Sequence, residues 1–259
     1  MPNPVVIKIG GSTLGSHDTT LEDAVALQRR GIPLIVVHGG AGRVTEWLAR
    51  HGWETSFLDG VRVTDENSLE MVAAVLGGLV NTELVADINA LGGRAVGMTG
   101  VDGNLLECKI TNPAIGYAGK VTKVNPEAIE ILLEANLIPV IAPPGARAPD
   151  EPANVLYINI NGDEIAGKLA ESLNARSLIF LTDVAGILDG DGRLLEELSA
   201  EQVRGLMNSG VINRGMIPKS EAALVALEGA SSVKIIDGRR AHALLEAIEG
   251  KPGGTVITA

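Results

Sequence analysis

Aromatic residues and cysteines are scarce in this sequence. Phe, Tyr and Trp make up 2% of the 259 residues. A buried core must therefore be built from Val, Ile, Leu and Ala, a composition typical of parallel strands that are buried on both faces. Cys108 is the single cysteine, which excludes an intramolecular disulfide and a cysteine-cluster metal site. The four histidines lack ligand spacing, so we expect no protein-bound metal.

Positive charge is also in short supply. The chain has 21 Lys and Arg against 32 Asp and Glu, which gives a formal net charge of −11. Nucleic acid and anionic membranes would repel such a protein at long range, so we expect neither as a partner. No uninterrupted apolar run reaches the length of a membrane span, and the first residues lack the pattern of a secretory signal. We therefore expect a cytoplasmic protein.

Short β-branched runs alternate with helical patterns along nearly the whole chain. This alternation predicts an α/β fold, a three-layer sandwich with a mostly parallel central sheet and helices on both faces. The predicted strands are residues 5–9, 33–38, 95–98, 138–142, 157–160, 177–182, 233–236 and 255–257. The predicted helices are residues 19–30, 65–91, 126–134, 200–208 and 217–228, with others following Gly42, Gly162 and Arg240. Residues 104–124 predict β-hairpins.

One segment indicates an internal boundary. Residues 146–153 are rich in proline and charge, a composition typical of a connection between lobes. We expect a single domain over residues 1–259, with an N-terminal lobe, 1–150, and a C-terminal lobe, 151–259.

Three glycine clusters follow predicted parallel strands, at the sheet edge where open α/β folds bind ligands. They are Gly10-Gly11, Gly39-Gly40-Ala41-Gly42 and Asp183-Val184-Ala185-Gly186. Glycine lets the backbone approach a phosphate closely, and a following helix N-terminus adds N–H donors. Each cluster alone is equally compatible with an ordinary strand-to-helix turn, but three together favour a phosphate site. Neither the P-loop motif nor a clean G-x-G-x-x-G is present.

Four charged residues stand out by position. Lys8 lies inside an apolar strand, where a charge is costly unless it serves a ligand. Lys219 and Asp163 each open a predicted helix, and Arg62 precedes one. Either lysine could instead be a surface or snorkelling residue, Asp163 a plain N-terminal helix charge and Arg62 part of a surface salt bridge. In a functional site Asp163 would orient both ammonium groups, and Arg62 would bind a carboxylate.

These residues, in this order, resemble the amino acid kinase family, and within it the N-acetylglutamate kinase branch, from Val5 to Ala259. The segments that carry the resemblance are 6–12, 36–41, 59–65, 97–104, 119–126, 157–163, 181–188 and 215–219. The resemblance implies transfer of the γ-phosphoryl group of ATP to the γ-carboxylate of N-acetyl-L-glutamate, a step of arginine biosynthesis. A carboxylate is already ionised at neutral pH, so no general base is needed.

The resemblance also implies a role for each site residue. Catalysis would fall to Lys8, Lys219 and Asp163. The substrate would be bound in the N-terminal lobe by Gly40, Ala41, Arg62 and Asn159. ATP would be bound chiefly in the C-terminal lobe, by Gly10, Gly11, Asp183, Val184, Ala185, Gly186, Ile187, Leu188, Val211, Ile212 and Asn213. Mg²⁺ would be carried by the nucleotide.

The sequence departs from the family pattern at a few positions. Ala41 stands where a third glycine is usual, and Gly162 where alanine is usual. The chain starts directly before the first strand, without the N-terminal helix of arginine-inhibited members, which favours a homodimer without arginine feedback. Residues 240–246 nevertheless partly resemble the arginine-sensing segment.

Other activities remain open at this point. The nearest alternative is a kinase for α-aminoadipate attached to an acidic carrier protein, although a charge of −11 suits such a partner poorly. Aspartokinase and glutamate 5-kinase usually carry C-terminal domains for which no room remains. Uridylate and carbamate kinases lack the Arg62 motif. A non-catalytic sensor would have no need for both lysines and Asp163.

Overall fold

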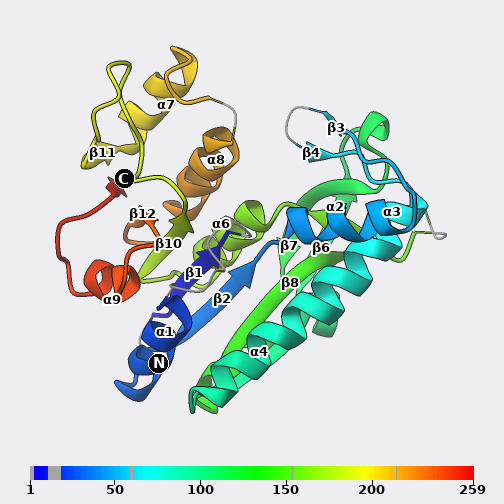
Figure 1. Cartoon of the computed structure of the whole chain (residues 1–259), viewed down its shortest axis with the longest axis horizontal. Coiled ribbons are helices and arrows are strands. Elements are labelled where there is room, and N and C mark those ends of the chain that lie inside the picture. Colours follow the sequence, from blue (N-terminus) through cyan, green and yellow to red (C-terminus); the bar gives the residue numbers. More distant parts are fainter. Residues whose placement is uncertain (1–2, 11–18, 59–60, 153–154, 214) are drawn as a thin grey trace.

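A large sheet forms the centre of the molecule (Figure 1). The structure is a computed structural model and describes residues 3–10, 19–58, 61–152, 155–213 and 215–259. The strand order is β11-β13-β12-β10-β1-β2-β8-β6-β7-β9, and β5 also pairs with β8. The strands are β1 (Val5–Ile9), β2 (Leu34–His38), β5 (Ala95–Gly100), β6 (Leu106–Ile110), β7 (Ala118–Val124), β8 (Ile138–Arg147), β9 (Tyr157–Ile160), β10 (Ser177–Thr182), β11 (Glu197–Ser199), β12 (Val233–Asp237) and β13 (Thr255–Thr258).

The centre of this sheet is parallel. β1 pairs in parallel with β10 and with β2, which pairs in parallel with β8. Antiparallel pairs occur further out, between β12 and β13, β6 and β7, and β8 and β9. The carboxyl ends of β10, β1 and β2 therefore meet at one edge. The three glycine clusters follow these strands.

Helices cover both faces of the sheet, and β1 explains why. Val5, Ile7 and Ile9 contribute to one hydrophobic cluster and Val6 to the other, as expected for side chains that alternate along a strand. The first cluster includes residues of α1 (Thr20–Arg29), α2 (Ala41–Arg50), α3 (Glu66–Val72), α4 (Asn81–Ala90) and α9 (Ala243–Ile248). The second includes residues of α5 (Glu127–Glu134), α6 (Gly162–Ser172), α7 (Ala200–Asn208) and α8 (Met216–Ala226). The predicted three-layer fold is confirmed.

Residues 66–90 form one long helical segment that runs beside β8 (Figure 1). Its middle, η1 (Ala73–Val80), is π-helical and joins α3 to α4. The segment is long and apolar enough to cross a membrane by length and composition. However, 44% of its most apolar window is buried inside the molecule, and residues such as Val75, Leu84 and Ile88 belong to the core. The core helix of a folded domain passes the same test, so length and composition alone do not indicate a membrane span.

Helices α6 and α8 pack closely. A Cβ atom on Gly167 of α6 would lie 2.6 Å from the carbonyl oxygen of Ala222 of α8. A Cβ atom on Gly229, just after α8, would lie 2.2 Å from the Glu171 carbonyl oxygen. Glycine is therefore needed where these two backbones meet, and the close contact fixes the distance between the helices.

Most predicted elements are present, with differences at their ends and in short strands. Strand β8 extends to Arg147, past the predicted end at residue 142. The long helical segment begins at Glu66 rather than at residue 65, because Asp65 is its N-cap and its side chain accepts from Ser68 N. Helix α9 begins at Ala243 rather than near Arg240. The hairpin β3 (Phe57–Leu58) and β4 (Val61–Arg62), and strand β11, were not foreseen.

The contact between α6 and α8 can be tested with two glycine substitutions. Gly167→Ala should lower the free energy of unfolding by about 1–3 kcal/mol, because the new methyl group meets backbone atoms. Gly205→Ala, in the middle of α7 with no atom within 4 Å of the added Cβ, should raise it by about 0.5–1 kcal/mol. Urea denaturation measures both. Equal effects of the two substitutions would contradict the proposed contact.

Candidate active site

Asp163 lies between two lysine ammonium groups. Lys8 Nζ is 2.7 Å from Oδ1 and Lys219 Nζ is 3.1 Å from Oδ2. The Lys219 contact is also a hydrogen bond, whereas the Lys8 contact is an ion pair whose geometry is not that of a hydrogen bond. The side chains of Lys8 and Asp163 are 9% and 7% exposed and that of Lys219 is 18% exposed. This group of three is called the two-lysine centre below.

Each member comes from a different element. Lys8 is the fourth residue of β1, beside Val37 of β2 and Phe180 of β10, and alternation places it on the sheet face covered by α6 and α8. Asp163 lies in the first turn of α6, whose N-cap Asn161 accepts a hydrogen bond from Asp163 N. Lys219 lies near the start of α8. The Asp163 carboxylate is favoured in the first turn of α6 because a helix N-terminus carries partial positive charge.

The charges of the two-lysine centre do not cancel. Burial alone would raise the pKa of Asp163, but the nearby ammonium groups of Lys8 and Lys219 outweigh it and hold that pKa below its ordinary value. Asp163 is therefore ionised at neutral pH, and two positive charges face one negative charge. The centre keeps one net positive charge at the carboxyl edge of the parallel strands, which suits an anionic group.

The glycine turns after β1 and β2 lie beside this centre. Gly10 N donates to Leu181 O and Gly39 N to Ile9 O, so both turns continue the pairing of their strands. A Cβ atom on Gly39 would lie 3.8 Å from Lys8 Nζ. Gly40 has a φ of +146° and its missing Cβ would lie 2.7 Å from Leu76. Only glycine fits this position without strain.

Arg62 is buried at the N-terminus of α2, beside the Gly40 turn. Its guanidinium group donates to Ala41 O at 2.8 Å, to Thr45 Oγ1 at 2.7 Å and to Thr55 Oγ1. Phe57, directly opposite Arg62 in the β3–β4 hairpin, stacks on the guanidinium at 4.8 Å. Burial lowers the pKa of Arg62, but arginine keeps its charge. Among the residues that the structure describes, the partners of this side chain are hydrogen-bond acceptors and the Phe57 ring, not the surface salt bridge that the sequence had left open.

Asn159 is linked to Arg62 through one threonine. Asn159 Nδ2 donates to Thr64 Oγ1 at 3.1 Å, and Thr64 Oγ1 donates to the carbonyl oxygen of Arg62 at 3.0 Å. Thr64 is fully buried. The structure therefore brings together Asn159 and Arg62, which are far apart in the sequence.

The predicted nucleotide residues fall into exposed and buried sets. The exposed set begins directly after β10 with Asp183, Val184 and Ala185. Leu188, further along the chain, is also exposed. Gly186 has a φ of +151° and packs on Thr255, whose hydroxyl accepts from Ile187 N. Ile187 and Ile212 belong to the core, so only their backbones could face a ligand. Val211 is half-buried and Asn213 is exposed. Gly11 lies outside the residues that the structure describes.

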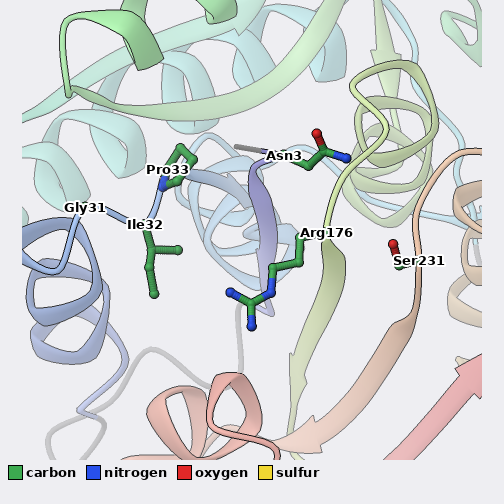
Figure 2. A pocket seen from close by; sticks show the side chains of 6 residues that line it. All are labelled: Asn3, Gly31, Ile32, Pro33, Arg176 and Ser231. Atoms are coloured by element: carbon green, nitrogen blue, oxygen red, sulfur yellow. The ribbon is translucent and has the colours of Figure 1, made fainter. Parts of the chain in front are cut away.

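A cavity of about 210 Å³ lies at the opposite edge of the sheet (Figure 2). Its lining residues precede β1, β2, β10 and β12, at their amino ends: Asn3, Gly31, Ile32, Pro33, Arg176 and Ser231. It contains no predicted site residue and offers one cation, Arg176. The two-lysine centre, with its clustered buried charges and glycine turns, is the better candidate for chemistry. Within the described ranges no three His, Cys, Asp or Glu residues lie together as metal ligands.

Comparison with known proteins agrees with this geometry. The model of the amino acid kinase family matches residues 3–237. The chain belongs to the amino acid kinase family. It is therefore a kinase, an enzyme that transfers a phosphoryl group from ATP.

Individual relatives make the placement within this family narrower. The chain is 44% identical to the acetylglutamate kinase of Dehalococcoides mccartyi strain BAV1, over 97% of this chain and 93% of the relative. Among solved structures, smu.665 from Streptococcus mutans UA159 has a TM-score of 0.84 at 29% identity, with both chains fully covered. The N-acetylglutamate synthase of Neisseria gonorrhoeae, solved with coenzyme A and N-acetyl-glutamate, has a TM-score of 0.85 at 26% identity, and the match covers 59% of that longer chain.

Several residues of the site were not found from the sequence. Thr45, Thr55 and Phe57 hold Arg62, and His38 and Asn81 contact each other beside the Gly39 turn. Thr64 also belongs to the site. It lies two residues after Arg62, on the same side of an extended chain, and this spacing was the one local sign that it would lie near Arg62. The other contacts form between distant segments and leave no local pattern.

The stabilising role of Asp163 can be tested with Asp163→Asn. Two buried ammonium groups then lose their anion, so the free energy of unfolding should fall by about 3–5 kcal/mol. Because the pKa of Asp163 is lower in the folded protein than in the unfolded chain, its contribution to stability is complete above the unfolded pKa of about 4. This contribution is lost only as the pH falls through the pKa of the folded protein. The loss, measured by urea denaturation, should thus be equal at about pH 6 and pH 8.

Asp150→Asn is the matched control for this measurement. Asp150 pairs with Lys109 at 2.5 Å on the surface, with side chains 65% and 41% exposed. Solvent screens such a pair, so its loss should change stability little. An Asp163→Asn protein as stable as this control would contradict the assigned charge interaction.

Proposed function

We propose that this kinase transfers the γ-phosphoryl group of MgATP to the γ-carboxylate of N-acetyl-L-glutamate, giving an acyl phosphate and ADP, the second step of arginine biosynthesis. The observation that carries the proposal is the two-lysine centre beside the glycine turns of β1 and β2. The names of the relatives support the choice of substrate.

The chemistry needs charge stabilisation and alignment more than proton transfer. The attacking carboxylate is ionised at neutral pH, so no general base is required. Attack in line on the γ-phosphorus forms the new O–P bond as the bond to the β-phosphate oxygen breaks, and the leaving electron pair goes to ADP. Lys8 would neutralise charge on the transferred group and Lys219 charge on the leaving side. Cationic groups in such roles contribute about 10³–10⁵ in rate.

Asp163 would organise both lysines. It holds each ammonium group with a separate oxygen, so the two charges stay apart and in fixed directions. Because both oxygens are engaged, Asp163 is a poor ligand for a metal. Mg²⁺ would accordingly enter with the phosphates of ATP.

The N-terminal lobe, 1–150, would bind the amino acid, with Asn159 contributing from the start of the other lobe. Arg62 would bind the α-carboxylate and Asn159 the amino-acid end, with Gly40 and Ala41 lining the same site. Both protons of Arg62 Nη2 are engaged by Ala41 and Thr45. A bidentate contact needs Nη2 together with Nε or Nη1, so the carboxylate would take the place of the Thr45 hydroxyl on Nη2.

The C-terminal lobe, 151–259, would bind ATP. Gly10 N already donates to Leu181 O, so the backbone N–H groups from Gly11 onward, with that of Gly40, would contact the phosphates. The exposed residues Asp183–Ala185 with Leu188, and the segment Val211–Asn213, would line the nucleotide site. The fixed base of this loop at Gly186 and Ile187 supports the assignment, because a held loop loses less entropy on binding.

We extend the proposal to a cytoplasmic homodimer. The outer side of the long helical segment is exposed at the small residues Ala74, Gly78 and Ala86, and less than half of its most apolar window is buried. A second copy of the chain would cover this surface. The mass of the purified protein in sedimentation equilibrium tests the dimer.

The reaction is tested directly by trapping the acyl phosphate with hydroxylamine. Wild type should form the acyl phosphate with ATP and N-acetylglutamate, and far less of it with aspartate, glutamate or α-aminoadipate. Added arginine should not change this result. Lys8→Ala and Lys219→Ala should each lower kcat by about 10³ or more because a transition-state charge is lost. Lys109→Ala, at a half-buried position of β6 whose side chain pairs with Asp150, is the control. Turnover near wild type in either variant would contradict the two-lysine mechanism.

The role of Arg62 is tested by Arg62→Ala. Loss of the charged hydrogen bonds to the α-carboxylate should raise KM for N-acetylglutamate about tenfold or more and leave KM for ATP nearly unchanged. Steady-state kinetics with each substrate varied in turn separates the two. An unchanged KM for the amino acid would remove Arg62 from the substrate site.

A further inference from the structure

His38 is a buried histidine that the mechanism above does not use. It is the last residue of β2, fully buried, and directly precedes the Gly39–Gly40 turn. Its Nδ1 atom lies 2.9 Å from the carbonyl oxygen of Gly39, and its Nε2 atom lies 3.1 Å from Asn81 Nδ2. Both ring nitrogens thus have partners.

These partners define which nitrogen carries the proton. A carbonyl oxygen only accepts, so Nδ1 must be the protonated nitrogen. The amide nitrogen of Asn81 only donates, and it also donates to Val140 O at 2.9 Å, so Nε2 must be the acceptor. A protonated ring would place an N–H group against the Asn81 amide donor. The contacts therefore fit one form of His38, the neutral Nδ1–H tautomer.

Asn81 is itself held in place by the fold. It directly follows the π-helical stretch η1, whose wider turns rotate the following residues about the helix axis. The side chain is buried against β5, where a Cβ atom on Gly97 would lie 1.9 Å from Asn81 Oδ1. The π-helical stretch thus aims Asn81 at His38, and Gly97 leaves the space for it. Stretches of this kind are frequent at functional sites.

The other contacts of His38 lead to the two-lysine centre. Gly39, whose carbonyl oxygen bonds to His38, also lies beside Lys8: a Cβ atom on Gly39 would be 3.8 Å from Lys8 Nζ. The missing Cβ of Gly162, next to Asp163, would lie 3.2 Å from His38 O. Leu76 of η1 packs on Gly40, on the far side of the same turn.

We propose that the neutral imidazole of His38, oriented by Asn81, is a positioning residue that fixes the Gly39–Gly40 turn relative to Lys8 during phosphoryl transfer. This inference rests on the proposed function of the same site. His38 touches neither substrate in this role; it acts through the turn. A displacement of about 1 Å at such a turn can cost about a hundredfold in rate.

Burial and the nearby charge of Lys8 keep His38 neutral. Burial, aided by the positive charge of Lys8, lowers the pKa of His38 to about 4, although the bond to Gly39 acts in the opposite direction. Lys8 is paired with Asp163, which also pairs with Lys219. The contacts from α4 and β8 come from the neutral groups Asn81 and Val140. A positively charged ring is therefore excluded at neutral pH by position as well as by hydrogen bonding.

Two substitutions separate positioning from packing. In His38→Asn the shorter amide can still donate near the place of Nδ1, whereas His38→Leu fills the buried space without any donor. Positioning predicts that kcat falls about tenfold to a hundredfold in His38→Leu and stays within about threefold of wild type in His38→Asn, with both KM values little changed. Packing predicts the reverse order. His51→Asn, on an exposed ring bonded to Trp47 O, is the control.

Nitrogen NMR of the histidine rings in the wild-type protein gives a test that needs no substitution. His38 should show the neutral Nδ1–H tautomer and no titration between about pH 5.5 and pH 8.5. A Nε2–H tautomer, a titration in that range, or a His38→Leu protein with a higher kcat than His38→Asn would overturn the proposal. A wild type that forms no acyl phosphate from N-acetylglutamate would instead contradict the proposed function, while the NMR result would stand.

Discussion

The carboxylate of Asp163 is the group on which the arrangement of the site depends. Lys8 and Lys219 are both largely buried, and their charges would repel each other without an anion between them. Because they come from β1 and α8, and Asp163 from α6, one ion-pair group joins three elements that are separate in the sequence. The close backbone contact between α6 and α8 at Gly167 keeps Asp163 and Lys219 at a constant separation. Rigidity in the fold thus becomes fixed charge geometry in the site.

The alternation of side chains along β1 links the core to the chemistry. Val5, Ile7 and Ile9 supply one apolar layer, while Val6 and Lys8 face the layer that holds α6 and α8. Lys8 lies near the carboxyl end of the strand, so its stem crosses the edge of the apolar core and its ammonium group reaches the glycine turns. A shift of one residue in the pairing of β1 would turn this charge toward the other layer, away from Asp163. The register of the fold and the geometry of the two-lysine centre therefore depend on the same hydrogen bonds.

The limits of prediction from the sequence follow from the range of each interaction. Long periodic segments such as residues 66–90 were identifiable, but their π-helical middle was not, since MVAAVLGGLV is apolar at nearly every position and gives no period. Hairpin β3–β4 and strand β11 are too short to alternate. Arg62 was expected to be ready for a carboxylate, whereas Thr45, Thr55 and Ala41 already occupy it. Such contacts depend on tertiary structure, which local patterns do not encode.

Gly162 gives a physical meaning to a departure from the family pattern. Alanine there would place its Cβ 3.2 Å from His38 O and 3.4 Å from Lys8 Cε. The first distance is tighter than ordinary packing and involves backbone, which yields less readily than a lysine stem. With glycine, the start of α6 approaches the ends of β1 and β2 without this contact. The direction of Lys8 is then set less by packing on α6 than by the charge of Asp163, so one carboxylate controls both the position and the electrostatics of Lys8.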